Sequence, residues 1–110
     1  MLSLEISAAE LAELQKTGKD DFVLLDVREP WEHQIGHLDR SVLMPMGDVP
    51  SRAHQELDPD VPIIVYCHHG VRSWHAAVFL EQQGLNNVHS LEGGIDAWAL
   101  EIDTEMKRYA

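Results

Sequence analysis

The chain carries the stretch Pro62-Ile-Ile-Val-Tyr-Cys67-His-His-Gly-Val-Arg72-Ser-Trp-His75, and the rest of the sequence is interpreted around it. Its first half is an apolar run rich in β-branched residues, which is typical of a strand buried on both faces. The run ends at Cys67, the only cysteine, and a helical pattern follows from Arg72 to Gly84. We therefore expect a thiol at the carboxyl end of a buried strand, facing the N-terminus of a helix.

Short apolar runs alternate with helical patterns along the whole chain. Strands are expected over residues 2–6, 22–27, 41–45, 63–66 and 88–91, and helices over 8–17, 31–34, 49–57, 72–83 and 96–102. This alternation predicts an α/β fold with parallel strands and helices on both faces of the sheet. At 110 residues, the chain is expected to form a single domain, residues 1–110. Ligands of such sheets bind beyond the carboxyl ends of the strands, which selects 26–29 and 67–72.

Local signals mark the ends of several elements. Ser7-Ala-Ala-Glu10 fits a capping box at the start of the first helix. Asp48 is expected to cap the helix over 49–57, and Gly93-Gly94 is expected to form a tight turn before the last helix. We expect the tail, residues 107–110, to be peripheral.

The composition excludes several classes of partner. Nineteen acidic residues against eight lysines and arginines give a formal net charge of -11, so nucleic acid and anionic membranes are poor partners. No apolar run approaches the roughly 20 residues of a membrane span, and the first residues do not resemble a signal peptide. A single cysteine cannot form an internal disulfide. A reducing compartment, the cytoplasm, is expected.

The residues after Cys67 predict a cradle for negative charge. Backbone N–H groups and a nearby cation stabilise a thiolate, and Gly70 would permit the tight curl that this requires. Arg72 would add a positive charge and two parallel donors for an oxyanion. Most lone cysteines are buried and inert. The Cys-x4-Arg spacing between strand and helix instead favours an exposed sulfur at an anion-binding site.

Histidines near this loop raise the question of a metal. Zinc needs three or four converging ligands at a recognisable spacing, and consecutive histidines seldom ligate one ion, so no metal site is predicted. His68 and His69 either line the pocket rim, where they would raise its positive potential as pH falls, or are simply exposed loop side chains.

Other conspicuous side chains have structural interpretations. Asp26 and Arg28 could form an acid/base pair, but a charge pair that ties a strand end to its neighbours is favoured. Trp31, Trp74 and Trp98 are expected to be packing residues rather than ligand platforms.

Taken together, the motifs resemble those of the rhodanese, or single-domain sulfurtransferase, family. The matching segments are Leu25-Asp26-Val27-Arg28-Glu29, Gly36-His37-Leu38 with Met44-Pro45, Tyr66-Cys67 to Arg72-Ser73, and Gly93-Gly94-Ile95-Asp96-Ala97-Trp98. They occur in the family's order across nearly the whole chain. Each one is weak by itself, but the set is specific.

The resemblance implies a five-stranded parallel sheet flanked by helices, and a thiosulfate sulfurtransferase. Cys67 would be the nucleophile that accepts a sulfane sulfur as a persulfide, and Arg72 would assist it. The substrate-binding loop would comprise His68, His69, Gly70 and Val71. The substrate would be a small sulfur-containing anion and the acceptor a thiol or a sulfur-carrier protein. No cofactor is implied.

The length of the loop and the departures from the family pattern bear on alternatives. Six residues from Cys67 through Arg72 resemble the sulfurtransferase loop, whereas related dual-specificity phosphatases have one more, which argues against a phosphatase. A relay module, fed by a cysteine desulfurase and showing little thiosulfate activity, is the second hypothesis. Arg40-Ser41 stands where the family usually has Gly-Ala; Arg40 either adds positive charge near the pocket or faces solvent.

Overall fold

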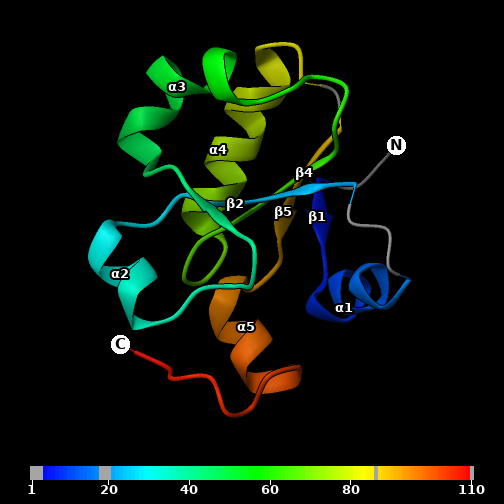
Figure 1. The fold of residues 1–110 in the computed structure, drawn as a ribbon, viewed down its shortest axis with the longest axis vertical. Coiled ribbons are helices and arrows are strands. Elements are labelled where there is room, and N and C mark those ends of the chain that lie inside the picture. Colours follow the sequence, from blue (N-terminus) through cyan, green and yellow to red (C-terminus); the bar gives the residue numbers. More distant parts are fainter. Residues whose placement is uncertain (1–3, 18–20, 86, 110) are drawn as a thin grey trace.

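Five parallel strands form one sheet in the order β1-β5-β4-β2-β3 (Figure 1). The computed structural model describes residues 4–17, 21–85 and 87–109. The strands are β1 (Glu5–Ile6), β2 (Val23–Asp26), β3 (Val42–Leu43), β4 (Ile63–Tyr66) and β5 (Val88–Leu91). The predicted α/β fold with a five-stranded parallel sheet is confirmed, and the expected β4 and β5 match the observed bounds.

Helices connect the strands. They are α1 (Ala8–Lys16), α2 (Pro30–Ile35), α3 (Val49–Glu56), α4 (Val71–Gln82) and α5 (Gly94–Glu101), and a 3-10 turn, η1 (Met46–Asp48), precedes α3. Figure 1 shows α3 and α4 on one side of the sheet and α1 and α5 on the other. None of the helices in the described part of the chain is long and apolar enough to cross a membrane.

The side chains of β4 explain why this strand is apolar throughout. Ile63 and Val65 belong to the core cluster that includes side chains of α3 and α4. Ile64 and Tyr66 belong to the cluster that includes α1 and α5. Because successive side chains of a strand point to opposite faces, a central strand covered on both faces must be apolar at every position.

Two of the predicted caps had different outcomes. Ser7 Oγ accepts from the Glu10 N–H at 3.1 Å and Glu10 Oε1 accepts from the Ser7 N–H at 3.0 Å, so the capping box is confirmed. Asp48 makes no side-chain cap to α3, and that prediction is wrong. Its backbone is already helical because η1 runs directly into α3, so its side chain does not take the extended cap position.

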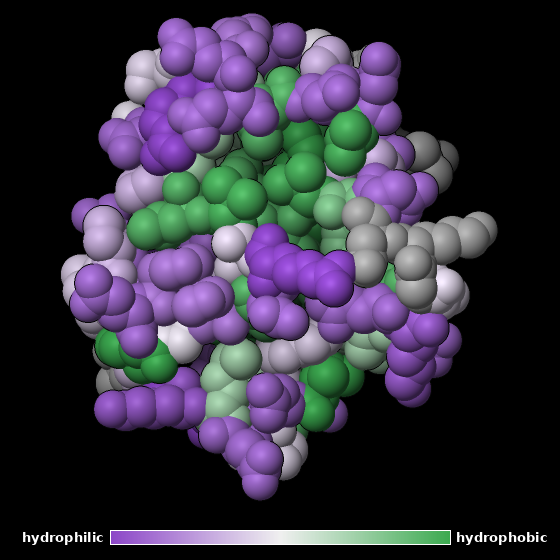
Figure 2. Space-filling model, in the orientation of Figure 1, coloured by the Kyte–Doolittle hydropathy of each residue, from purple (hydrophilic) through white to green (hydrophobic). Residues whose placement is uncertain are grey.

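Apolar side chains gather on the upper half of one face of the molecule, where α3 and α4 lie (Figure 2). A cavity of about 160 Å³ between these helices is lined mainly by apolar side chains. His75 lines this cavity together with Phe79 and Met46. The side chain of His75 therefore lies at the groove between α3 and α4.

Candidate active site

The ends of β2 and β4 meet at the carboxyl edge of the sheet. Asp26 and Tyr66 are register partners, and the Val27 N–H donates to the Tyr66 carbonyl at 3.1 Å. The segment after Asp26 and the loop after Cys67 therefore begin side by side, as the strand-end rule predicts.

The loop after β4 wraps around the sulfur of Cys67. The backbone N–H groups of Gly70 and Ser73 point at Cys67 Sγ, with N···S distances of 3.1 and 3.3 Å. The Ser73 hydroxyl lies 3.4 Å from the same sulfur and 2.8 Å from the hydroxyl of Ser90. Gly70 has φ +104°, which a residue with a Cβ adopts only with strain. The curl that places these donors therefore depends on glycine.

The predicted exposure of the sulfur is wrong. Cys67 is only 1% exposed, because the loop amides and Ser73 close around it. A reagent must enter the loop to reach the sulfur, so a small or extended donor group fits the site better than a bulky one.

The N-terminus of α5 is hydrogen-bonded to the loop after Cys67. The N–H groups of Ile95 and Asp96 donate to the carbonyls of Cys67 and His68 at 2.8 and 3.1 Å. Gly94 has φ +62°, and a Cβ there would collide with both carbonyls. The Gly-Gly pair thus does more than form the predicted turn: it lets two backbones approach closely.

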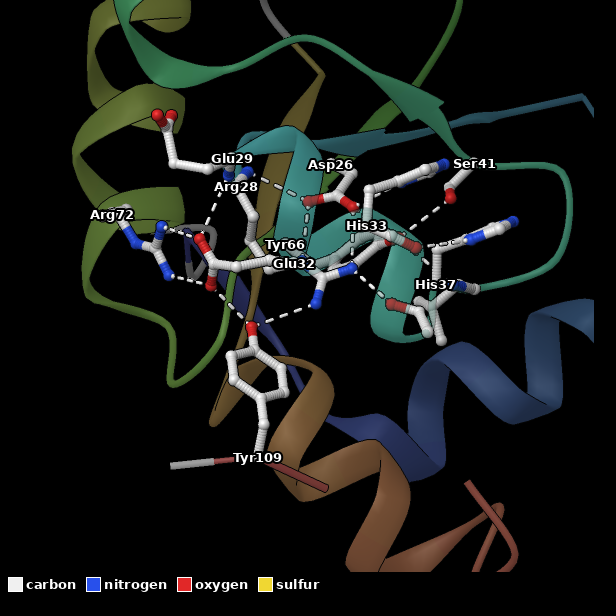
Figure 3. Close-up of polar contacts among 12 residues, drawn as sticks. Asp26, Arg28, Glu29, Glu32, His33, His37, Ser41, Tyr66, Arg72 and Tyr109 are labelled. Atoms are coloured by element: carbon white, nitrogen blue, oxygen red, sulfur yellow. Dashed lines mark hydrogen bonds and ion pairs between the residues drawn. The ribbon is translucent and has the colours of Figure 1, made fainter. Parts of the chain in front are cut away.

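Arg72, the predicted anion-binding residue, forms a two-point ion pair with Glu32 of α2. Nη1 and Nη2 donate to Oε1 and Oε2 at 2.7 and 2.9 Å (Figure 3). The hydrogen bonds from Arg72 lower the pKa of Glu32 to about 2. The hydrogen bonds to Glu32 in turn raise the pKa of Arg72 above its ordinary value. Arg72 is therefore a fixed cation at the loop.

Tyr109 connects the tail to this ion pair. Its hydroxyl donates to Glu32 Oε2 at 2.6 Å and accepts from Arg28 Nη1 at 3.0 Å (Figure 3). Burial and the bond to Glu32 raise the pKa of Tyr109 to about 12. The expectation of a peripheral tail is wrong for this residue, because an aromatic ring with a polar tip can pack and bond at once. Ala110 lies outside the described residues.

Asp26 and Arg28 form the predicted charge pair. Arg28 Nη2 lies 2.8 Å from Asp26 Oδ2, and both side chains are fully buried. Burial alone would raise the pKa of Asp26, but hydrogen bonds from Arg28 and His33 outweigh it and the pKa is lowered. The hydroxyl of Tyr66 also donates to Asp26 at 3.2 Å. Arg28 in addition donates to the Gly36 carbonyl, so the pair ties the end of β2 to the segment after α2.

The two loop histidines differ from each other. The ring of His68 lies between those of His69 and Tyr109, each stacked on it at 3.9 Å. Burial, followed by the proximity of His69, lowers the pKa of His68, so this ring carries less charge at neutral pH than an exposed histidine. His69 is 60% exposed and its Nε2 lies 3.8 Å from an Asp96 oxygen.

Within the part of the chain that the structure describes, one group of side chains could hold a metal ion. It consists of His68, His69 and Asp96, whose potential metal-binding atoms lie within 4.8 Å of one another. The two imidazole rings are stacked with their planes 19° apart, and because an imidazole nitrogen binds a metal in the plane of its ring, two stacked rings are poorly arranged to share one ion. Asp96 is also paired with Arg108 at 2.9 Å. The absence of a metal site remains a prediction.

The remaining candidates have mixed outcomes. Trp98 is buried as a packing residue. Trp31 and Trp74 are 57% and 42% exposed and lie outside the core, but Trp31 makes a packing contact with the ring of Tyr109 at 5.8 Å and Trp74 one with His75 at 5.3 Å. Val71 of the predicted loop is 67% exposed.

Arg40 lines a small cavity away from the loop after Cys67. The other residues that line this cavity are Gln15, Phe22, Leu24 and Asp39, none of which belongs to that loop.

Residues that the sequence analysis did not select complete the site. Glu32 stands three residues after Glu29 in a capping box, a local signal that says nothing of Arg72. Ser73 appears in the sequence only as the last residue of the loop motif, and Ser90 of β5 carries no signal, so neither could be predicted to lie at the sulfur of Cys67. Tyr109 is one aromatic residue in a polar tail, which could suggest packing but no partner.

Known proteins resemble this chain over most of its length. The family model described as the rhodanese-like domain matches residues 7–101. A thiosulfate sulfurtransferase, GlpE, from Pseudoalteromonas translucida is 36% identical over 105 residues, covering 94% of this chain and 95% of that protein. A protein named sulfurtransferase from Allochromatium vinosum is 39% identical over 80 residues, covering 73% of this chain and 74% of that one.

Solved structures share the fold. A rhodanese-related protein from Thermoplasma volcanium superposes with a TM-score of 0.80 at 38% identity, covering 89% of this chain and 92% of that chain. A rhodanese-like domain from Anabaena gives a TM-score of 0.82 at 27% identity, covering 99% of this chain and 88% of that chain.

Proposed function

This chain belongs to the rhodanese-like domain family, and on that premise we propose that it is a thiosulfate sulfurtransferase acting through a persulfide on Cys67. The observation that carries the proposal is the pair of backbone N–H groups, from Gly70 and Ser73, aimed at Cys67 Sγ. Such donors stabilise negative charge on sulfur, both in the thiolate and in the persulfide.

In the first half-reaction the Cys67 thiolate attacks the outer sulfur of thiosulfate. A new S–S bond forms to Cys67, the S–S bond of thiosulfate breaks, and sulfite leaves with the bonding electron pair. Arg72 binds the oxyanion end of the donor through the N–H groups that Glu32 does not occupy. The donor enters the loop at an opening lined by the side chains of His68, His69 and Val71.

In the second half-reaction a thiophilic acceptor attacks the outer sulfur of the persulfide. The S–S bond to Cys67 breaks, the thiolate is regenerated, and the loop N–H groups receive its charge again. The proposed two-step reaction requires no metal and no organic cofactor. A reducing compartment such as the cytoplasm would keep the single thiol available for this chemistry.

A protein acceptor is the finer part of the proposal. Val71 and Trp74 are exposed apolar side chains three residues apart on α4, next to the loop. Residues at this spacing share one face of a helix, so the two form a contact surface for a partner larger than a small anion. A relay in which a persulfidic protein is also the donor is the second candidate, and it uses the same Cys67.

Mass spectrometry of the intact protein tests the proposal. Thiosulfate should add one sulfur atom to the wild type, cyanide should remove it, and Cys67→Ser should gain none. An unchanged wild-type mass with thiosulfate, together with a gain from a cysteine persulfide, would replace thiosulfate by a persulfide donor. No gain from either donor would refute the proposal. Cys67-dependent hydrolysis of an aryl phosphate would favour a phosphatase instead.

A further inference from the structure

We infer that Tyr109 is a positioning residue for the active-site loop: its hydroxyl orients Glu32, and Glu32 in turn orients the guanidinium of Arg72. The inference rests on the proposed function for its kinetic consequences, but the positioning itself concerns only contacts within the chain. Figure 3 shows the side chains of Arg72 and Tyr109 both reaching the carboxylate of Glu32, where they share one oxygen.

The direction of the hydrogen bonds at the Tyr109 hydroxyl is determined by its neighbours. Arg28 can only donate, so the hydroxyl oxygen accepts from Arg28 Nη1 at 3.0 Å. The hydroxyl proton is then directed to Glu32 Oε2, 2.6 Å away. Arg28 is itself buried and bound to Asp26, so it gives the tyrosine oxygen a fixed anchor.

The carboxylate of Glu32 is held from several directions. Oε2 receives the Tyr109 hydroxyl and Arg72 Nη2, while Oε1 receives Arg72 Nη1 and the Glu29 N–H at 3.0 Å. Removing the hydroxyl would leave Oε2 with Arg72 alone among these donors. The carboxylate could then rotate, and the two-point geometry that aims the guanidinium would loosen.

The ring of Tyr109 makes a second contact with the same loop. It stacks on His68 at 3.9 Å with the planes 10° apart, and it forms a T-shaped pair with Trp31 at 5.8 Å. The tail therefore reaches the loop at two points, the residue after Cys67 and, through Glu32, the arginine. A phenylalanine would keep the stacking and lose only the hydroxyl.

The test compares Tyr109→Phe and Tyr109→Ala with Lys107→Ala, an exposed residue of the same tail. Tyr109→Phe should raise KM for thiosulfate by roughly threefold to tenfold, the loss of one hydrogen bond, with kcat little changed. Lys107→Ala should have the KM and kcat of the wild type. Tyr109→Ala should show the rise in KM expected of Tyr109→Phe and, in addition, a lower kcat. In an Arg72→Ala background, Tyr109→Phe should have no further effect on KM.

A second measurement separates this inference from the proposed function. Iodoacetate is an anion and iodoacetamide is neutral, so the ratio of their alkylation rates at Cys67 reports the cation held at the loop. Tyr109→Phe should lower that ratio by roughly threefold to tenfold. If the wild type transfers no sulfur, the proposed function fails, and the alkylation ratio alone then decides whether Tyr109 positions the loop. If the wild type does transfer sulfur, an unchanged KM in Tyr109→Phe would overturn the inference. If it does not, an unchanged alkylation ratio in Tyr109→Phe would overturn it.

Discussion

Glu32 and Arg72, 40 residues apart in the sequence, form a two-point ion pair with N···O distances of 2.7 and 2.9 Å. The arginine that closes the active-site loop is thus bound to a carboxylate before any substrate arrives. A guanidinium has five N–H donors, so the two used by Glu32 leave others to face an oxyanion. Glu32 determines the direction in which those donors point.

Replacing Arg72 by lysine should weaken transfer while a positive charge is kept. Lysine cannot form the paired, planar hydrogen bonds of a guanidinium. We expect kcat/KM for thiosulfate to fall by roughly tenfold to a hundredfold, the loss of a hydrogen bond to a charged group. Steady-state kinetics measure this, and an undiminished kcat/KM in Arg72→Lys would remove the role assigned to the guanidinium.

Arg72→Ala should also cost stability, because it leaves the carboxylate of Glu32, only 4% exposed, without its cation. The double variant Arg72→Ala/Glu32→Gln removes the stranded charge. It should recover stability in urea unfolding but recover no transfer activity. Recovered activity would show that Arg72 serves only to neutralise Glu32.

Acid should destabilise the protein through Glu32. Its pKa in the fold is about 2, below the ordinary value of 4.5, so the stabilisation is complete above the ordinary value and is lost as pH falls through the folded one. Between about pH 5 and pH 3 this group should account for about 2 kcal/mol of the fall in unfolding free energy.

Urea unfolding of Glu32→Gln at several pH values isolates this contribution. The fall in its unfolding free energy between about pH 5 and pH 3 should be smaller than that of the wild type by about 2 kcal/mol. Glu101→Gln, an exposed glutamate of α5, is the matched control and should follow the wild type. Parallel curves for Glu32→Gln and the wild type would contradict the assignment.

Gly94→Ala should disrupt the loop around Cys67. The added Cβ would meet the carbonyls of Cys67 and His68, and the φ of +62° is unfavourable to alanine. We expect a loss of about 2–4 kcal/mol in unfolding free energy and a lower rate of persulfide formation. Gly47→Ala is the control, since its Cβ would meet nothing within 4 Å. Equal stability of the two variants would disprove the close approach.

Asp26→Asn should act on stability and leave the chemistry alone. It would leave the buried guanidinium of Arg28 without its counter-charge, at a cost of about 3–5 kcal/mol. Once corrected for the folded fraction, the pH dependence of transfer should match that of the wild type. The loss of one limb of that pH profile would instead make Asp26 an acid or base of the reaction.

The sequence predicted the sheet and the central loop because both depend on short-range patterns. A short apolar run without alternation, rich in β-branched residues and preceded by proline, is typical of a strand covered on both faces, as Ile63 to Tyr66 are. A cysteine, a glycine and an arginine between such a strand and a helix predicted the cradle, and Gly70 does adopt the positive φ that the curl needs. The Ser7 capping box is equally local.

By itself, then, the sequence determined the α/β sheet, the helices on both faces and a loop whose amides surround Cys67. Only the tertiary structure decided that Cys67 is buried, that Glu32 holds Arg72, and that Tyr109, 77 residues from Glu32, completes the site. Helical periodicity shows which face of α2 or α4 is apolar, but it does not name the partner of a polar side chain such as Glu32 or Arg72, and Tyr109 lies in a tail with no periodicity at all. Their partners depend on how helix, loop and tail pack together, and that packing is set by the core as a whole.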